Sequence, residues 1–133
     1  MSGKQAILTQ KLKCDLMKKQ RVSWKRVQKA IGKIARWAKK HSFTEVYGLP
    51  RGGLVPAVML SHALKIPLLG GNATMRGTTL VVDDIADTGK TLLKFTNKEC
   101  KIATLFYKKH SITKPDFWVY EKKKAWIVFP WEV

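Results

Sequence analysis

The sequence predicts one α/β domain in which a mainly parallel central sheet is flanked by helices. Short apolar runs rich in β-branched and aromatic residues alternate along the chain with segments of helical periodicity. That alternation is typical of parallel strands joined by helical crossovers. The length of 133 residues fits a single domain with a modest core. In such a sheet, ligands bind beyond the carboxyl ends of the strands, so the residues that follow each strand are the first candidates for a site.

The charge balance narrows the class of ligand. The chain has 26 Lys and Arg residues against 9 Asp and Glu residues, which gives a formal net charge of +17. Half of the basic residues lie in Met1–Lys40, where Asp15 is the only acidic residue. A field of this sign attracts polyanions. A nucleic acid and a sugar that carries phosphate groups both qualify, and the charge alone does not choose between them.

The amino-terminal residues 1–20 are polar and basic and are predicted to be an extension, either loosely held or a short helix, with the folded domain over residues 21–133. No apolar run approaches the length of a membrane span, and Met1–Gln10 lacks the layout of a signal peptide. The two cysteines, Cys14 and Cys100, have no metal-ligand spacing and are expected to be reduced thiols. The sequence therefore predicts a cytoplasmic protein with no membrane association.

The first half of the predicted domain contains two helices and one strand. A helix is predicted over Trp24–Lys40, with Ser23 as its N-cap. Apolar residues recur on one side of it, and the basic side is expected to be a solvated surface. The apolar set is Trp24, Val27, Ile31, Ile34 and Ala38. A buried strand is expected over Thr44–Leu49, and the apolar segment Leu54–Leu64 is expected to form the next helix.

The second half of the chain continues the alternation. A brief strand is expected over Ile66–Leu69, followed by a loop over Gly70–Thr78. A strand is predicted over Thr79–Val82, and a helix over Gly89–Thr96. Three further strands are predicted over Lys101–Tyr107, Asp116–Tyr120 and Ala125–Phe129.

The segment after Val82 carries the most chemical information. Asp83 and Asp84 lie at the tip of a predicted strand, and a Thr-Gly-Lys-Thr turn over residues 88–91 leads into the predicted helix. Adjacent carboxylates accept hydrogen bonds from a ribose diol or face a magnesium ion. The unpaired N–H groups at a helix N-terminus hold a phosphate, and Gly89 lets the backbone approach it closely. The triphosphate-binding P-loop is excluded, because that motif has a glycine at the position of Asp84.

This segment resembles the phosphoribosyl-pyrophosphate signature of the type I phosphoribosyltransferases. The resemblance implies that the paired acids hold the ribose hydroxyls and that the following loop holds the 5′-phosphate. The substrate-binding residues implied in this segment are Asp83, Asp84, Ala86, Asp87, Thr88, Gly89, Lys90 and Thr91. Lys90 departs from the small residue that is commoner at its position, and it adds a positive charge.

The run Leu49–Pro56 resembles the pyrophosphate loop of the xanthine-guanine (6-oxopurine) members of that family. The resemblance implies that Pro50, Arg51, Gly52 and Gly53 bind the diphosphate, and exposed amides beside a forked guanidinium suit that ligand. Pro50 stands where the family has a serine. The family often has a cis peptide bond before the arginine, which here implies a cis bond between Pro50 and Arg51.

The run Trp126–Glu132 resembles the ending of the same enzymes. It implies that Trp126 stacks on a purine base, that the main chain of Ile127 reads the base edge, and that Glu132 lies near the metal. The family also uses a lysine on the strand after the phosphate loop to donate to the 6-oxo group of the purine. Lys108 is in the matching place, with Lys109 as the fallback. Core packing for Trp126 and a surface position for Lys108 are the alternatives.

The resemblance implies a purine phosphoribosyltransferase of purine salvage. Such an enzyme transfers the phosphoribosyl group of phosphoribosyl pyrophosphate to guanine, xanthine or hypoxanthine and releases pyrophosphate, with magnesium (Mg2+) as the cofactor. The implied metal ligands are Asp83, Asp84 and Glu132. The implied catalytic residues are Arg51, which stabilises the leaving diphosphate, and Asp87, which lies near the imidazole edge of the base.

One departure from the family concerns a loop. Related enzymes have a long mobile loop that closes over the reacting centre, whereas this chain offers only the shortened flexible loop Gly70–Thr78. Arg76 in this loop is a candidate diphosphate contact. The short loop leaves open a regulatory protein on the same fold with weak or no catalysis. The basic residues leave open a nucleic-acid-binding protein, and a homo-oligomer also remains open.

Overall fold

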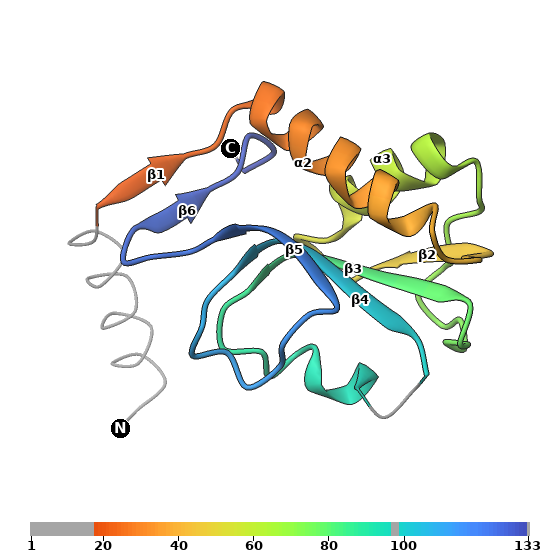
Figure 1. Ribbon diagram of the computed structural model, residues 1–133. Helices are drawn as coiled ribbons and strands as arrows, with labels where there is room; N and C mark the ends of the chain where they lie inside the picture. Colours follow the sequence, from red (N-terminus) through yellow and green to blue (C-terminus); the bar gives the residue numbers. More distant parts are fainter. Residues whose placement is uncertain (1–17, 97–98, 133) are drawn as a thin grey trace.

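The computed structural model describes residues 18–96 and 99–132, which fold around a four-stranded sheet (Figure 1). The strand order is β2 (Glu45–Gly48), β3 (Thr79–Ala86), β4 (Lys101–Tyr107) and β5 (Phe117–Glu121). Each neighbouring pair is parallel. This arrangement confirms the predicted α/β domain with a mainly parallel sheet.

A second, two-stranded sheet joins the two ends of the described chain. It pairs β1 (Lys19–Arg21) with β6 (Trp126–Val128) in parallel. Hydrogen bonds of 2.9 Å from Val22 N to Val128 O and of 2.8 Å from Trp126 N to Lys18 O extend the pairing on both sides. The predicted extension over residues 1–20 lies outside the described residues except for 18–20, and its predicted boundary falls within β1.

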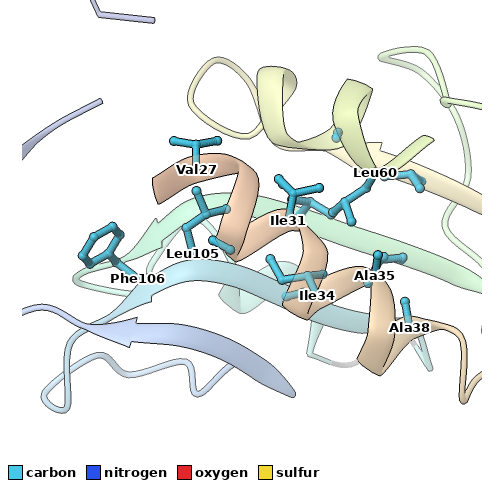
Figure 2. Close-up of a cluster of buried hydrophobic side chains, with 14 of the residues drawn as sticks. Val27, Ile31, Ile34, Ala35, Ala38, Leu60, Leu105 and Phe106 are labelled. Atoms are coloured by element: carbon cyan, nitrogen blue, oxygen red, sulfur yellow. The ribbon is translucent and has the colours of Figure 1, made fainter. Parts of the chain in front are cut away.

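Two helices, α2 (Trp24–Ala38) and α3 (Leu54–Leu64), cover one face of the four-stranded sheet (Figure 1). Ser23 caps α2 as predicted, because its hydroxyl accepts a hydrogen bond of 3.1 Å from Arg26 N. Figure 2 shows Ile31 and Ile34 of α2 in one buried cluster with Leu60 of α3 and Leu105 of β4. In the described ranges, no helix is both long enough and apolar enough to cross a membrane.

Trp24 was expected on the buried side of the first helix, and this prediction is wrong. Its side chain is 48% exposed and packs against the ring of Trp131, with 6.0 Å between the ring centroids. The apolar face of α2 begins instead at Val27, which is fully buried. The basic side of α2 is exposed as expected, although the guanidinium of Arg26 lies 4.2 Å from the ring centre of Tyr120.

The opposite face of the sheet is covered differently. In the described part of the chain it meets a single 3₁₀ turn, η1 (Leu93–Phe95), and loops. Tyr47 and Val81 face this side, and Phe95 of η1 packs on them. The prediction that helices flank the sheet is therefore confirmed on the face that α2 and α3 cover.

Several predicted bounds match the structure, others shift by one or two residues, and three elements differ more. The helix over Leu54–Leu64 and the strand over Lys101–Tyr107 are confirmed at both ends. Strand β3 is longer than predicted, because its pairing with β4 continues to Ala86 opposite Tyr107. The helix predicted over Gly89–Thr96 is wrong, since only η1 forms there. The strand predicted over Ile66–Leu69 is reduced to one bridge, between Leu68 and Val46.

The loop Gly70–Thr78 ends at the amino ends of the strands. There the guanidinium of Arg76 donates to both carboxylate oxygens of Glu45, at 3.0 and 2.7 Å. The hydroxyl of Thr79 donates to the same carboxylate at 2.8 Å. Glu45 begins β2 opposite Thr79, at the far end of the sheet from Asp83 and Asp84. The suggestion that Arg76 contacts a diphosphate is therefore wrong, because Arg76 anchors its loop to a buried carboxylate.

Replacing Glu45 by Gln is expected to lower the melting temperature at neutral pH, because it removes the paired contact with Arg76. The hydrogen bonds from Arg76 and then from Thr79 hold the pKa of Glu45 below its ordinary value of 4.5. A carboxyl with a depressed folded-state pKa stabilises the protein above its unfolded pKa, and this contribution is lost as the pH falls through the folded pKa. Thermal unfolding followed over an acid-to-neutral series should show the two proteins converging in acid.

The control for that series is Glu99→Gln, which neutralises an exposed carboxylate near Gly77. It is expected to leave the melting temperature close to that of the wild type at every pH. Equal losses in the two variants at neutral pH would contradict a specific role for the contact between Glu45 and Arg76.

Candidate functional site

The carboxyl ends of β2 and β3 lie side by side, and the chain turns there into the loop 49–53. Leu49 N donates to Val82 O at 2.9 Å, and Gly53 N donates back to Leu49 O at 2.8 Å. The peptide bond between Pro50 and Arg51 is cis, which confirms the prediction. The side chain of Arg51 is exposed at the tip of the loop. The predicted pyrophosphate loop thus lies at the edge where ligands of parallel sheets bind.

This loop packs directly on the paired acids. A Cβ atom on Gly52 would overlap the carboxylate of Asp84, so only a glycine allows this approach. A cavity of about 670 Å³, which we call the arginine cavity, opens beside the contact. It is lined by Arg51, Gly52, Asp84, Trp131 and Glu132. The fold therefore brings together the arginine loop, one of the paired acids and the carboxyl-terminal acid, which are far apart in sequence.

The acids at this cavity lie in surroundings that disfavour their ionised forms. Burial, reinforced by the charge of Asp84, raises the pKa of Asp83. Burial also raises the pKa of Asp84, and burial together with the charge of Asp84 raises that of Glu132. Backbone amides donate to one carboxylate oxygen of each aspartate: Asp84 N donates to Asp83 Oδ1 at 2.8 Å, and Ile85 N donates to Asp84 Oδ1 at 2.8 Å. The remaining oxygens suit a cation or the hydroxyls of a sugar.

The acids fit a magnesium ion that arrives together with a phosphorylated ligand. In proteins Mg²⁺ is usually bound through one or two carboxylates, with the other positions taken by water and substrate phosphates. Within residues 18–96 and 99–132, no three His, Cys, Asp or Glu side chains are arranged to hold a metal by themselves. Asp84 and Glu132 line the arginine cavity, whereas Asp83 is buried and is not among its lining residues. The donor set therefore suits a shared metal better than a cage made by the protein alone.

The loop over residues 88–91 is held by another loop and not by a helix. Gly89 has a φ of +79°, and a Cβ atom there would overlap the hydroxyl of Ser111. Ile112 N donates to Thr88 O at 3.0 Å, and the hydroxyl of Thr113 donates to Gly89 O at 2.6 Å. Thr88, Lys90 and Thr91 are exposed. An anion at this loop would meet its side chains and amides without the helix dipole that the sequence predicted.

A second, smaller cavity adjoins the first. This tryptophan cavity has a volume of about 190 Å³ and shares Asp84 and Glu132 with the arginine cavity. Its other lining residues are Ile85, Asp87, Lys122, Trp126, Ile127 and Phe129. Trp126 and Ile127 come from β6, and Asp87 follows the last residue of β3. A small cavity with an aromatic ring in its wall suits a planar, partly polar ligand.

Asp87 lies between two lysines at the edge of the tryptophan cavity. Lys122 Nζ is 2.8 Å from one carboxylate oxygen, and Lys108 Nζ is 3.7 Å from the other. Lys108 also donates its backbone N–H to Ala86 O at 3.0 Å, where Ala86 is buried at the end of β3. Lys109, the fallback for Lys108, is 74% exposed and pairs with Glu121. The structure thus places Lys108 beside Asp87 and Lys109 away from it.

Sequence reasoning missed Lys122 and Thr113. The side chain of Lys122 is only 5% exposed, yet in the sequence it is the first of three consecutive lysines and nothing there separates it from its exposed neighbours. Thr113 supports Gly89 from a loop 24 residues away. Neither residue belongs to a motif, so only the folded structure shows their positions.

The carboxyl edge of this parallel sheet carries an Arg-Gly-Gly loop, paired acids and a glycine loop. These features together indicate a protein of the class that binds phosphorylated sugars. A family profile described as the phosphoribosyl transferase domain matches residues 73–133. The described fold is similar to the crystal structure of a purine phosphoribosyltransferase from Pyrococcus horikoshii, with a TM-score of 0.76 and 32% identity over 86% of this chain and 95% of that one.

Two bacterial proteins, each named xanthine-guanine phosphoribosyltransferase, are similar in sequence. The one from Idiomarina loihiensis is 29% identical over 84% of this chain and 86% of its own length. The one from Chromohalobacter salexigens is 25% identical over 84% of this chain and 83% of its own length. The chain belongs to the phosphoribosyltransferase family.

Replacing Asp84 by Asn is expected to raise the melting temperature measured without magnesium or donor, because it removes the charge of a half-buried carboxylate that adjoins the buried Asp83. A carboxyl whose pKa is raised in the folded state costs stability as the pH rises above its unfolded value, here 3.8. The gain should therefore be larger at neutral pH than in acid. Thermal unfolding at the two pH values measures it.

Glu121→Gln, which neutralises an exposed carboxylate, is the control and is expected to show no such gain. Adding magnesium with phosphoribosyl pyrophosphate should stabilise the wild type and leave the Asp84 variant nearly unchanged. An Asp84 variant that melts below the wild type at neutral pH would contradict the account given for the paired acids.

Proposed function

We propose that this protein transfers the phosphoribosyl group of phosphoribosyl pyrophosphate to a 6-oxopurine base and releases pyrophosphate. The observation that carries the proposal is the junction of the two cavities, which share Asp84 and Glu132. A sugar donor in the arginine cavity and a base in the tryptophan cavity would be neighbours, as a transfer between them requires. The names of the similar proteins from Idiomarina and Pyrococcus support a purine as the acceptor.

The donor side of the proposed site has three parts. Asp83 and Asp84 accept hydrogen bonds from the ribose hydroxyls, and the loop over residues 88–91 holds the 5′-phosphate. The loop over residues 50–53 holds the diphosphate, with the Arg51 guanidinium directed at its oxygens. Magnesium, when bound through Asp84 and Glu132, which line the arginine cavity, supplies positive charge to the diphosphate. Arg51 adds to this and stabilises the charge that grows on the leaving group as its bond to C1′ breaks.

The acceptor side is proposed to lie in the tryptophan cavity. Trp126 stacks on the purine, and the main chain of Ile127 contacts its edge. As the bond from the purine nitrogen to C1′ forms, the imidazole ring of the base gives up a proton. Asp87 is the neighbouring acceptor for that proton and fixes the orientation of the ring. Ala86 contributes by position, because it ends β3 directly before Asp87.

Two alternatives rest on particular observations. Arg76 is bound to Glu45 at the far end of the sheet, so the end of the loop Gly70–Thr78 is fixed away from the proposed centre. This favours a regulatory protein with weak catalysis over an enzyme with a full lid. The exposed basic side of α2 favours nucleic acid as a secondary partner. The names of the similar proteins support purine salvage, whereas a homo-oligomer and a cytoplasmic location stay predictions.

The proposal predicts formation of a nucleotide from phosphoribosyl pyrophosphate and guanine, xanthine or hypoxanthine in the presence of magnesium. Arg51→Met should lower kcat/KM by about 100-fold, because a cation aimed at the leaving group is lost. Chromatographic separation of base and nucleotide measures the rate.

Arg36→Met provides a control of equal charge change, because Arg36 is exposed on α2. It is expected to keep the wild-type rate. If no base yields a nucleotide although calorimetry detects binding of the donor, the transferase proposal is wrong and the regulatory alternative gains support. Equal losses in the two arginine variants would contradict the role of Arg51.

A further inference from the structure

The glycine turn at residues 88–91 has no α-helix behind it. The next regular element along the chain is the 3₁₀ turn η1, which spans 3 residues and begins at Leu93. A turn of that length supplies no helix dipole to an anion at residues 88–91. The glycine turn is held instead by residues 111–113, which lie in the loop between β4 and β5. What residues 111–113 fix in the turn therefore indicates how it can bind an anion.

Residues 111–113 fix two consecutive carbonyl groups of the glycine turn. Ile112 N donates to Thr88 O at 3.0 Å, and the hydroxyl of Thr113 donates to Gly89 O at 2.6 Å. The peptide bonds that contain these two carbonyls are trans and planar, so each N–H points away from the C=O of its own peptide unit. The N–H groups of Gly89 and Lys90 are therefore both directed away from residues 111–113.

Two consecutive N–H groups directed to one side of a turn form a concave site for an anion. Lys90 N lies 3.4 Å from the hydroxyl of Thr88, which places that hydroxyl on the same side as the N–H groups. Thr88 and Lys90 are exposed on either side of Gly89. A phosphate on this side of the turn would accept hydrogen bonds from both N–H groups and from the hydroxyl of Thr88.

Thr113 lies behind the glycine turn and is itself fixed in place. The residue is 1% exposed, and a Cβ atom on Gly89 would overlap both Thr113 N and the hydroxyl of Ser111. The hydroxyl of Ser111 donates to Thr113 O at 2.7 Å and accepts from Thr113 N at 3.3 Å. Because Thr113 is buried behind the turn, it acts on a ligand through Gly89 and not by direct contact.

We propose that Thr113 is a positioning residue for the 5′-phosphate of the ligand. By holding Gly89 O, it directs the N–H groups of Gly89 and Lys90 at the phosphate, so residues 111–113 take the place of a helix behind the turn. This assignment rests on the proposed function. It makes the hydroxyl of Thr113 determine how strongly the site prefers a ribose with a 5′-phosphate to a ribose without one.

The test compares the binding of inosine 5′-monophosphate and inosine by calorimetry, without turnover. The two ligands differ only in the 5′-phosphate, so the ratio of their affinities measures what the phosphate contributes. The wild type is expected to prefer the nucleotide. Thr113→Val removes the hydroxyl at nearly constant volume and should reduce this preference by about 3- to 10-fold, the range for one neutral hydrogen bond. The affinity of Thr113→Val for inosine should equal that of the wild type.

Three further variants complete the design. Thr113→Ser keeps the hydroxyl and should retain most of the preference. Thr104→Val makes the same change at a fully buried threonine whose hydroxyl has no hydrogen-bond partner among the described residues, so it should behave as the wild type. Ser111→Ala removes the two contacts that fix Thr113 and should also reduce the preference. It is measured beside Thr113→Val, so that poor folding of one variant leaves the comparison intact.

The outcomes separate this assignment from the function on which it rests. A preference that Thr113→Val leaves unchanged, or that Thr104→Val reduces equally, overturns the assignment and leaves the proposed function standing. The same holds for equal losses of affinity for both ligands, which indicate general damage to the fold. If the wild type binds neither ligand, the proposed function is overturned, and the assignment fails with it. A preference reduced in Thr113→Val and Ser111→Ala but kept in Thr113→Ser and Thr104→Val supports both.

Discussion

The close approach of the loop 49–53 to the end of β3 is the constraint on which the site depends. Because β2 and β3 are parallel neighbours in register from Glu45 opposite Thr79 to Gly48 opposite Val82, both chains leave the sheet at one edge. The hydrogen bond from Leu49 N to Val82 O continues the pairing into the loop, and Gly52 then lies against Asp84. A side chain at position 52 would overlap the carboxylate of Asp84, so the loop that carries the exposed Arg51 could not approach it as closely.

The sequence predicted the bounds of an element most accurately where the pattern of apolar residues was uninterrupted. The apolar segment Leu54–Leu64 and the β-branched run Lys101–Tyr107 have the predicted bounds. β3 was predicted too short because Asp83 and Asp84 break the apolar pattern, whereas the pairing with β4 carries the strand on to Ala86. The helix over Gly89–Thr96 was predicted from its local residues, but the contacts of Thr88 and Gly89 with residues 111–113 decide the path of the chain there.

For the candidate site, the structure brings together several residues that the motifs predicted, but the motifs did not predict how those residues pair with one another. Arg51, Gly52, Asp84 and Glu132 meet at one cavity, and Asp87, Trp126 and Ile127 meet at the next, as residues of one predicted site should. Two basic residues make contacts that the sequence did not predict. Arg76 pairs with Glu45, and Lys122 is buried against Asp87. Composition and spacing predict neither pairing, because a single sequence holds no information on which distant carboxylate a long side chain will reach.

Helices cover one face of the four-stranded sheet, and a short turn and loops cover the other. This difference bears on how easily each layer opens locally. One face is closed by α2 and α3, whose buried side chains form a continuous apolar cluster with β3 and β4. The other is closed by η1 and by loops that include the glycine turn at residues 88–91. We expect backbone amides in the first layer to exchange with solvent more slowly than those in the second, where smaller local openings expose them. The proposed 5′-phosphate loop, residues 88–91, leads from β3 into the thinner layer at η1, whereas the loop 49–53 leads into the helical layer at α3.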